Sequence, residues 1–203
     1  MLKKVERGDG MDKLAVLRQY FGFPAFRAGQ QTLIDAVLSG RDALGVMPTG
    51  GGKSLCYELP ALLLPGMTLV VSPLISLMKD QVMALRNAGI PAGCINSSMS
   101  LDELRETYSD ARYGAYKLLY VAPERLLTDG FCSLAQELEI PLVAVDEAHC
   151  ISQWGQDFRP SYLKIVEFLQ RLPRRPAVAA FTATATAQVR ADIIRILQLH
   201  EPE

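Results

Sequence analysis

Three consecutive glycines run directly into a lysine and a serine where residues 47–55 read MPTGGGKSL. Glycine lets backbone N–H groups turn inward around phosphate oxygens, and a lysine ammonium at this spacing can reach the terminal phosphates of a nucleotide. The serine hydroxyl can ligate Mg²⁺, and a helix that follows would direct its positive N-terminal end at the same phosphates. The pattern therefore predicts a phosphate-binding loop. Its residues are Thr49, Gly50, Gly51, Gly52, Lys53 and Ser54.

One position departs from the strict form of this pattern. G-x-x-x-x-G-K-S has glycine where this chain has Met47. The alternative interpretation is a glycine-rich turn before an ordinary helix. The direct junction of the glycine triplet with lysine and serine favours the phosphate loop over such a turn.

A pair of acids ends a short apolar run where residues 141–150 read PLVAVDEAHC. The apolar run is typical of a strand buried on both faces of a parallel sheet. Acids at the end of such a strand are costly to bury unless they hold a metal ion or a polarised water. Paired with the Gly52-Lys53-Ser54 loop, they predict a hydrolytic site with Lys53, Asp146 and Glu147 as catalytic residues. In this site Asp146 and Ser54 would hold Mg²⁺ and Glu147 would activate water. The alternative is an acidic helix start after a strand.

Composition limits the possible functions. The chain has 203 residues, 49% of them hydrophobic, which is enough for one well-buried domain and short for two. The formal net charge is −1, so contacts with nucleic acid must be local or use a partner domain. We interpret the basic stretch 171–175 as solvated surface.

No C-x-x-C pair occurs, so we expect no zinc site, and we expect the free thiols to lie in a reducing cytoplasm. The cysteines are Cys56, Cys94, Cys132 and Cys150.

Short apolar runs alternate with helix-like segments along the chain. The expected helices are Asp12–Tyr20, Gln30–Ser39, Lys53–Leu63, Leu74–Ala88, Leu101–Tyr113, Ser161–Arg171 and Ala187–Leu197. The expected strands are Ala43–Met47, Thr68–Val71, Gly93–Ile95, Lys117–Val121, Leu142–Val145 and Ala177–Phe181. This alternation predicts an α/β fold with a mostly parallel central sheet flanked by helices. Residues 59–78 carry no charge, but three prolines and a glycine in them favour helix end, turn, strand and next helix over a membrane span.

Polar or turn-forming clusters follow five of the expected strands. These clusters are Gly50–Ser54, Ser72-Pro73, Ala122–Arg125, Asp146–His149 and Thr182–Ala185. Ligands of open parallel sheets bind beyond the carboxyl ends of the strands. We therefore expect all five clusters to lie along one edge of the sheet, which would be the active face.

An ordered set of residues precedes the phosphate loop with the spacing L-x3-F-G-x3-F-R-x2-Q, beginning at Leu17 and ending at Gln30. It resembles the adenine-recognition motif of RecQ-family DNA helicases. A glutamine amide offers a donor and an acceptor that match the N6 and N7 edge of adenine. The resemblance implies that Gln30 reads the base while Phe23 and Arg27 flank it. The alternative is an amphipathic helix whose phenylalanines, Phe21 and Phe26, lie in the core.

The tetrad Asp146 to His149 also occurs in DEAH-box RNA helicases, so the segment after it decides between the two groups. Residues 151–160 read ISQWGQDFRP and are similar to the aromatic-rich loop of RecQ helicases. Aromatic faces stack on unpaired bases at roughly 1–3 kcal/mol per base. The resemblance implies a sensor that couples single-stranded DNA to hydrolysis. Its predicted residues are His149, Trp154, Phe158, Arg159, Thr182 and Thr184.

Two features of this loop leave alternatives open. Trp154 and Phe158 at helical spacing could instead pack in a core, although Gly155 and Pro160 argue against a continuous helix. Arg159 could bind a phosphate or form an ion pair. The family pattern has histidine where this chain has Gln156, which can form hydrogen bonds but cannot carry a proton.

The resemblance covers residues 14–200 and implies a P-loop NTPase domain of the RecA-like type. We expect a flexible segment over residues 1–11 and a first helicase motor domain over residues 12–203. ATP and Mg²⁺ are the implied cofactors, and single-stranded and duplex DNA the implied partners, in the cytoplasm or on a bacterial nucleoid. A second RecA-like domain, in cis or in trans, would supply arginines to the ATP site. The implied function is 3′–5′ DNA unwinding in recombination and repair. The alternatives are a DEAH-like RNA helicase domain and a nucleotide- and DNA-binding half-motor without hydrolysis.

Overall fold

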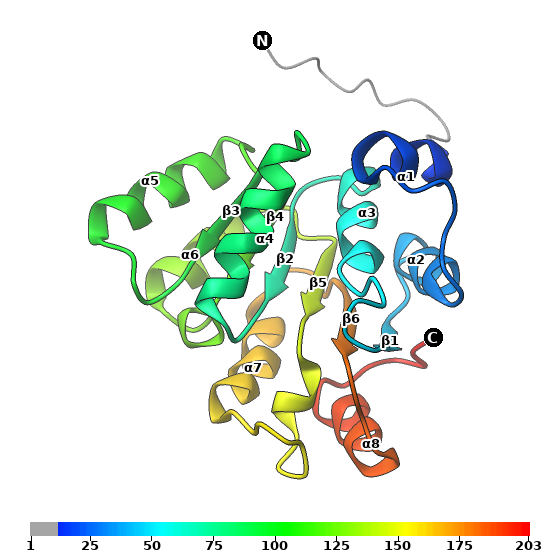
Figure 1. The fold of residues 1–203 in the computed structure, drawn as a ribbon. Coiled ribbons are helices and arrows are strands. Elements are labelled where there is room, and N and C mark those ends of the chain that lie inside the picture. Colours follow the sequence, from blue (N-terminus) through cyan, green and yellow to red (C-terminus); the bar gives the residue numbers. More distant parts are fainter. Residues whose placement is uncertain (1–11) are drawn as a thin grey trace.

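Six parallel strands form one sheet in the order β1-β6-β5-β2-β4-β3 in this computed structural model, which describes residues 12–203. The strands are β1 (Ala43–Val46), β2 (Thr68–Val71), β3 (Ala92–Ile95), β4 (Leu118–Val121), β5 (Leu142–Val145) and β6 (Ala177–Thr182). The expected parallel α/β fold is confirmed, and all five polar clusters follow carboxyl ends at one edge (Figure 1). The expected flexible segment, residues 1–11, lies outside the described residues.

Helices cover both faces of the sheet. The helices are α1 (Lys13–Phe21), α2 (Gln30–Leu38), α3 (Leu55–Leu63), α4 (Ile75–Asn87), α5 (Leu101–Arg112), α6 (Asp129–Glu137), α7 (Lys164–Arg171) and α8 (Ala187–Ile196). Helices α1 to α4 pack against one face through one apolar cluster, and α5 to α8 pack against the other through a second. Both faces of β2, β4, β5 and β6 are therefore buried. Double burial explains why these strands read as continuous apolar runs instead of alternating patterns.

Several local expectations are corrected by the structure. Helix α6 is not among the expected helices, and α3 begins at Leu55, so Lys53 and Ser54 belong to the turn before it. Three short 3₁₀ helices also occur. The first two follow β4 and β5 and are additional to the expected elements, whereas the third forms the first turn of the expected helix Ser161–Arg171, which continues as α7. The three 3₁₀ helices are η1 (Pro123–Arg125), η2 (Ala148–Ile151) and η3 (Pro160–Leu163).

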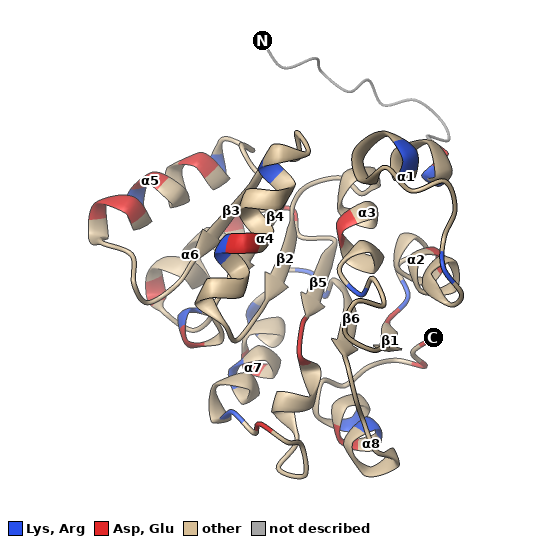
Figure 2. Ribbon diagram, in the orientation of Figure 1, with Lys and Arg blue, Asp and Glu red and all other residues tan. Residues whose placement is uncertain are grey.

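Residues 59–78 divide as expected into the end of α3, a turn, β2 and the approach to α4. Within residues 12–203, no helix combines the length and the apolar character that crossing a membrane requires. Figure 2 shows acidic and basic residues interspersed over most of the helices, with acids prominent along α5.

The basic stretch 171–175 is not wholly solvated surface, because Arg175 forms an ion pair with a buried carboxylate. Its Nη2 lies 2.6 Å from Oδ2 of Asp42, whose side chain is buried. Asp42 also accepts backbone hydrogen bonds from Val178 and His200. Burial opposes ionisation of Asp42, but the bonds from Arg175 and these two N–H groups outweigh it and lower its pKa. The network ties the segment after α8 to the start of β1.

Candidate functional site

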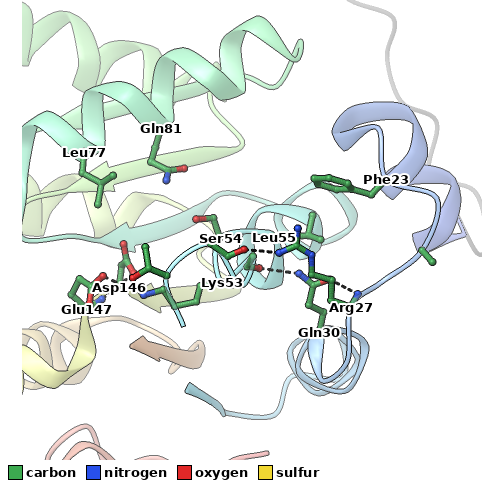
Figure 3. Close-up of a pocket in the computed structure, with 14 residues that line it drawn as sticks. Phe23, Arg27, Gln30, Lys53, Ser54, Leu55, Leu77, Gln81, Asp146 and Glu147 are labelled. Atoms are coloured by element: carbon green, nitrogen blue, oxygen red, sulfur yellow. Dashed lines mark hydrogen bonds and ion pairs between the residues drawn. The ribbon is translucent and has the colours of Figure 1, made fainter. Parts of the chain in front are cut away.

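A cavity of about 410 Å³ opens at the carboxyl edge of the sheet and brings together residues that are far apart in the sequence (Figure 3). At one end lie the phosphate-loop residues and the acid pair, and at the other end lies the segment before α2. Its lining includes these expected nucleotide-site residues: Phe23, Arg27, Gln30, Thr49, Gly50, Gly52, Lys53, Ser54, Asp146 and Glu147. The arrangement suits an elongated ligand with a phosphate tail and a base.

The loop before α3 has a backbone that only glycine adopts without strain. Gly50 and Gly52 have φ angles of 76° and 82°, in the left-handed region. A Cβ on Gly51 would lie 2.8 Å from the carbonyl oxygen of Pro48. Ser54 is the N-cap residue of α3, so this helix begins directly after the loop that lines the cavity. The glycine triplet is thus required by geometry, which favours the phosphate loop over an ordinary turn.

The acid pair lies directly across from the phosphate loop. Nζ of Lys53 is 3.3 Å from Oε1 of Glu147, so the two expected catalytic groups form an ion pair. Glu147 has a φ angle of 46°, a strained conformation for a residue with a side chain, and its N–H donates to Oδ1 of Asp146. Burial, with the neighbouring negative charge of Glu147, raises the pKa of Asp146 to about 6.

The chemistry of the donors in the cavity fits Mg²⁺. Within residues 12–203, no group of three or more His, Cys, Asp or Glu side chains could hold a metal ion. Mg²⁺ does not need a group of this kind. It typically binds through one or two protein oxygens, keeps several waters and takes substrate phosphates as its remaining ligands. The Ser54 hydroxyl and the buried Asp146 carboxylate are two hard oxygen donors in the same cavity.

The base end of the cavity is formed by the segment that precedes α2. Gln30 is 2% exposed, its Nε2 donates to the Gly52 carbonyl oxygen at 3.1 Å, and its Oε1 accepts from the Arg27 N–H. Nη1 of Arg27 donates to the Gly50 carbonyl oxygen at 2.5 Å. Phe23 is half exposed, as a stacking surface requires. The residues expected to recognise the base therefore also hold the phosphate loop.

For two phenylalanines of this region the packing alternative is confirmed, and two residues that were not expected there line the cavity. Phe21 and Phe26 are partly buried against the core, so the packing alternative holds for them. Leu77 and Gln81 of α4 line the cavity opposite the phosphate loop, a role that the sequence patterns do not predict (Figure 3). Their four-residue spacing, which places both side chains on one helix face, is the one signal that could have indicated a common surface.

A chain of contacts runs from the acid pair to the segment after β6. Nδ1 of His149 is 3.3 Å from Oε2 of Glu147 and 2.9 Å from Oγ1 of Thr182. The Thr182 hydroxyl donates to the Thr184 carbonyl oxygen, so Nδ1 is the donor to both neighbours. Thr184 contributes its backbone, while its side chain is exposed. Of the two threonines, only Thr182 bonds through its side chain.

The loop after η2 carries an exposed aromatic surface. Trp154 is 74% exposed, so the alternative of a packed tryptophan is wrong, and Phe158 is half buried. Arg159 forms an ion pair with Asp157 and donates to the Pro73 carbonyl oxygen. The ion pair that the sequence allows is therefore formed, while the binding of a phosphate by Arg159 stays a prediction.

This loop and the η3 turn after it contact the acid-pair segment as well as the turn after β2. The Tyr162 hydroxyl, in η3, donates to the Asp146 carbonyl oxygen at 2.8 Å. A Cβ on Gly155 would collide with the carbonyl oxygen of His149, so the turn beside Trp154 lies directly against the acid-pair segment. The exposed aromatic surface and the acid pair are thus parts of one packed unit.

A buried acid behind the phosphate loop leads to a pH-dependent prediction. Glu58 in α3 is buried, and its nearest hydrogen-bond donor is the Tyr120 hydroxyl at 3.4 Å. Burial raises the pKa of Glu58 to about 7, against the opposing Tyr120 bond. Between about pH 4.5 and 7 the unfolded chain is ionised while the folded chain keeps the proton, so stability falls as pH rises. The stability of Glu58→Gln relative to the unmodified chain should therefore rise by about 2–3 kcal/mol from pH 4.5 to pH 8.

Urea unfolding at several pH values measures this difference. Glu106→Gln, on the exposed face of α5, is the matched control and should give a difference near zero throughout. A Glu58→Gln difference that does not change with pH would show that Glu58 is not protonated in the folded chain.

The sequence of the chain is similar to those of known helicases. Residues 27–193 match the DEAD/DEAH box helicase family. The chain is 52% identical over 187 residues to the ATP-dependent DNA helicase RecQ of Bacillus subtilis, covering 92% of this chain and 31% of that protein. It is 49% identical over 189 residues to RecQ of Pasteurella multocida, covering 93% and 30%. The chain thus spans about a third of the length of these relatives.

Solved structures show the same fold. A hypothetical ATP-dependent RNA helicase from Sulfolobus tokodaii has a TM-score of 0.72 at 22% identity, covering 94% of this chain and 55% of that one. The helicase domain of Hef from Pyrococcus furiosus has a TM-score of 0.66 at 21% identity, covering 92% and 38%. The family match over most of the chain and the similarity to RecQ lead to one conclusion. The chain belongs to the DEAD/DEAH box helicase family, and over most of its length it is similar to RecQ DNA helicases.

Proposed function

We propose that residues 12–203 are the first RecA-like motor domain of a 3′–5′ DNA helicase that couples ATP hydrolysis to single-stranded DNA in recombination and repair. One observation carries the proposal. The exposed Trp154 loop packs against His149, and Tyr162 in the η3 turn after it donates to the Asp146 carbonyl oxygen of the acid pair that faces the phosphate loop. A base stacked on this loop would therefore act on the segment that carries the hydrolytic residues. The relatives named RecQ support DNA as the nucleic acid.

The residues of the cavity have separate roles in binding the base, in binding the phosphates and in activating water. Gln30 and Arg27 bind and orient the adenine end, and Phe23 supplies a stacking face. The loop N–H groups and Lys53 bind the phosphates. Mg²⁺ held by Ser54 and Asp146 would neutralise phosphate charge when bound. Glu147 orients the attacking water and takes its proton. When Lys53 binds phosphate, its ion pair with Glu147 breaks, which leaves the carboxylate free to act as the base.

A second RecA-like domain is part of the proposal. The chain spans about a third of its RecQ relatives, which leaves length for further domains in a protein of that kind. An arginine from a second domain would stabilise the charge that develops on the transferred phosphate. The protein would act on DNA in the cytoplasm, and the isolated domain would bind nucleotide but hydrolyse it slowly.

Trp154 offers a direct test of DNA binding because it is the only tryptophan in the chain. Stacking of a base on the indole should quench its fluorescence, and the signal comes from the proposed contact itself. A short oligothymidylate should quench Trp154 with a saturable curve, and an RNA of equal length should bind more weakly. Equal or tighter binding of the RNA would favour a DEAH-like RNA helicase domain. No response to either would contradict the nucleic-acid role of this loop.

Gln30 tests the recognition of the base. Replacing Gln30 with Ala removes the amide that lies against the loop and is proposed to read adenine. Each lost hydrogen bond is worth about 0.5–1.5 kcal/mol. We expect affinity for ATP to fall about tenfold and affinity for inorganic triphosphate to fall clearly less, because triphosphate loses only the support that Gln30 gives the loop through Gly52. Gln31→Ala, whose side chain is exposed, is the matched control, and isothermal titration measures both. Equal losses for ATP and triphosphate would assign Gln30 to support of the loop alone.

A further inference from the structure

Ser152 has a buried hydroxyl that makes two hydrogen bonds at the base of the Trp154 loop. The residue has no exposed surface. Its Oγ donates to Oδ2 of Asp192 at 2.7 Å and accepts the N–H of Trp154 at 3.1 Å. One hydroxyl therefore joins the backbone of the exposed tryptophan to a carboxylate in α8, 40 residues later in the chain. No local sequence pattern indicates this connection.

Asp192 lies on the inner side of α8 and is 6% exposed. A carboxylate in such a position must have hydrogen-bond partners, because an unpaired buried charge is costly. Oδ2 accepts from Ser152, and Oδ1 accepts from Nη2 of Arg195 at 2.9 Å. Arg195 itself is largely exposed, so the Ser152 hydroxyl is the inward partner of Asp192.

The bond is one of two attachments between the same pair of segments. Nδ1 of His149 contacts Oγ1 of Thr182 at 2.9 Å, and three residues later Ser152 contacts Asp192. Thr186, between Thr182 and Asp192, caps α8 by accepting the Val189 N–H. The segment from the acid pair to Trp154 is therefore fixed on β6 and α8 at both ends.

We propose that Asp192 is a positioning residue that acts through Ser152 to hold Trp154 in a fixed place relative to His149 and Glu147. Without this attachment the loop keeps its aromatic surface but loses its fixed geometry. A base stacked on Trp154 then no longer moves the acid-pair segment in a defined way. The role in coupling rests on the proposed function, whereas the positioning of Trp154 is a property of the protein without DNA.

The fluorescence of Trp154 separates these two parts. In the DNA-free chain, Asp192→Ala should lower the steady-state anisotropy of Trp154 and increase its quenching by acrylamide. With oligothymidylate, affinity should fall about five- to tenfold, as expected for a lost hydrogen bond to a charged group. Affinity for ATP should stay within about twofold, because Asp192 does not line the nucleotide cavity.

Three further variants make the test specific. Asp192→Asn keeps an oxygen that accepts the Ser152 hydroxyl, so it should restore most of the anisotropy and DNA affinity. Ser152→Ala removes this bond and also the acceptor of the Trp154 N–H, while Asp192 keeps its Arg195 contact, so its effect should be at least as large as that of Asp192→Ala. Arg195→Ala, which keeps the Ser152 bond, should behave as the unmodified chain. The melting temperature of each variant is measured as well, so that only variants that fold like the unmodified chain are compared.

The outcomes are distinct. If Asp192→Ala and Ser152→Ala leave the anisotropy and acrylamide quenching of Trp154 unchanged, the positioning role is overturned. This holds for any result of the titration with oligothymidylate. If the unmodified chain shows no response of Trp154 to DNA, the proposed function fails, while the DNA-free anisotropy still decides the positioning role.

Discussion

Replacing Lys53 with Ala is expected to abolish ATP turnover and to weaken binding of Mg·ATP about 10- to 100-fold, since a hydrogen bond to a charged group is worth about 1.5–3 kcal/mol. Lys53 is the one side-chain cation of the phosphate loop, and its ammonium already lies inside the cavity, 3.3 Å from Glu147. Isothermal titration of the chain with ATP and with ADP measures the loss. The loss should be larger for ATP, because Lys53 reaches the terminal phosphates.

The matched control is Lys79→Ala, which removes an exposed lysine of α4 outside the nucleotide cavity. Its affinity for nucleotide should match that of the unmodified chain. If Lys53→Ala bound Mg·ATP as tightly as the unmodified chain, the cavity at the glycine loop would not be the phosphate site.

Replacing Glu147 with Gln should have the opposite profile, with ATP binding kept and turnover lost. The amide has nearly the same shape as the carboxylate but cannot take a proton from water. General-base catalysis contributes about 10²- to 10⁴-fold, so kcat should fall by that factor while the affinity for ATP changes little. Any change in affinity for ATP should be toward tighter binding, because Lys53 no longer has to break an ion pair with the Glu147 carboxylate before it binds phosphate. Single-turnover hydrolysis and nucleotide titration measure the two quantities separately.

Glu167→Gln is the control for this substitution, because Glu167 lies on the exposed side of α7 in an ion pair with Arg171. Its kcat should be unchanged. Turnover at the normal rate in Glu147→Gln would mean that another group activates the water and that the assigned base is wrong.

The fold can be predicted largely from local sequence patterns. Strands such as Leu142–Val145 are buried on both faces, so their sequences are continuous apolar runs that stand out from the helices between them. The parallel order follows because each strand is followed by a helix that returns over the sheet. The shared edge of the polar clusters follows in turn from the parallel order. The same reasoning places Lys53 and Glu147 in one site, although they are 94 residues apart in the chain.

The elements that the sequence patterns do not predict lack such local signals. Helix α6 has Gly130 as its second residue, and glycine is a poor helix former, which obscures the short apolar pattern of Phe131, Leu134 and Ala135. The 3₁₀ helix η2 follows a left-handed Glu147, a conformation that no rule for non-glycine residues anticipates.

Long-range side-chain pairs are also beyond local patterns. Basic runs are usually solvated, but Arg175 pairs with Asp42, which lies 133 residues away. The bond between Ser152 and Asp192 has the same character. The motif resemblance predicts that Gln30 reads adenine, whereas the contact of its amide with the phosphate loop is visible only in the structure.

ATP hydrolysis by a protein that carries this domain together with the proposed second RecA-like domain decides whether the site drives a DNA-coupled motor. Hydrolysis is measured without nucleic acid, with single-stranded DNA and with RNA of equal length, using Glu147→Gln as the blank. We predict turnover that DNA stimulates at least about tenfold, that RNA stimulates less, and that Glu147→Gln abolishes. Hydrolysis that is the same with and without DNA, or that persists in Glu147→Gln, would contradict a DNA-coupled motor domain built on this site.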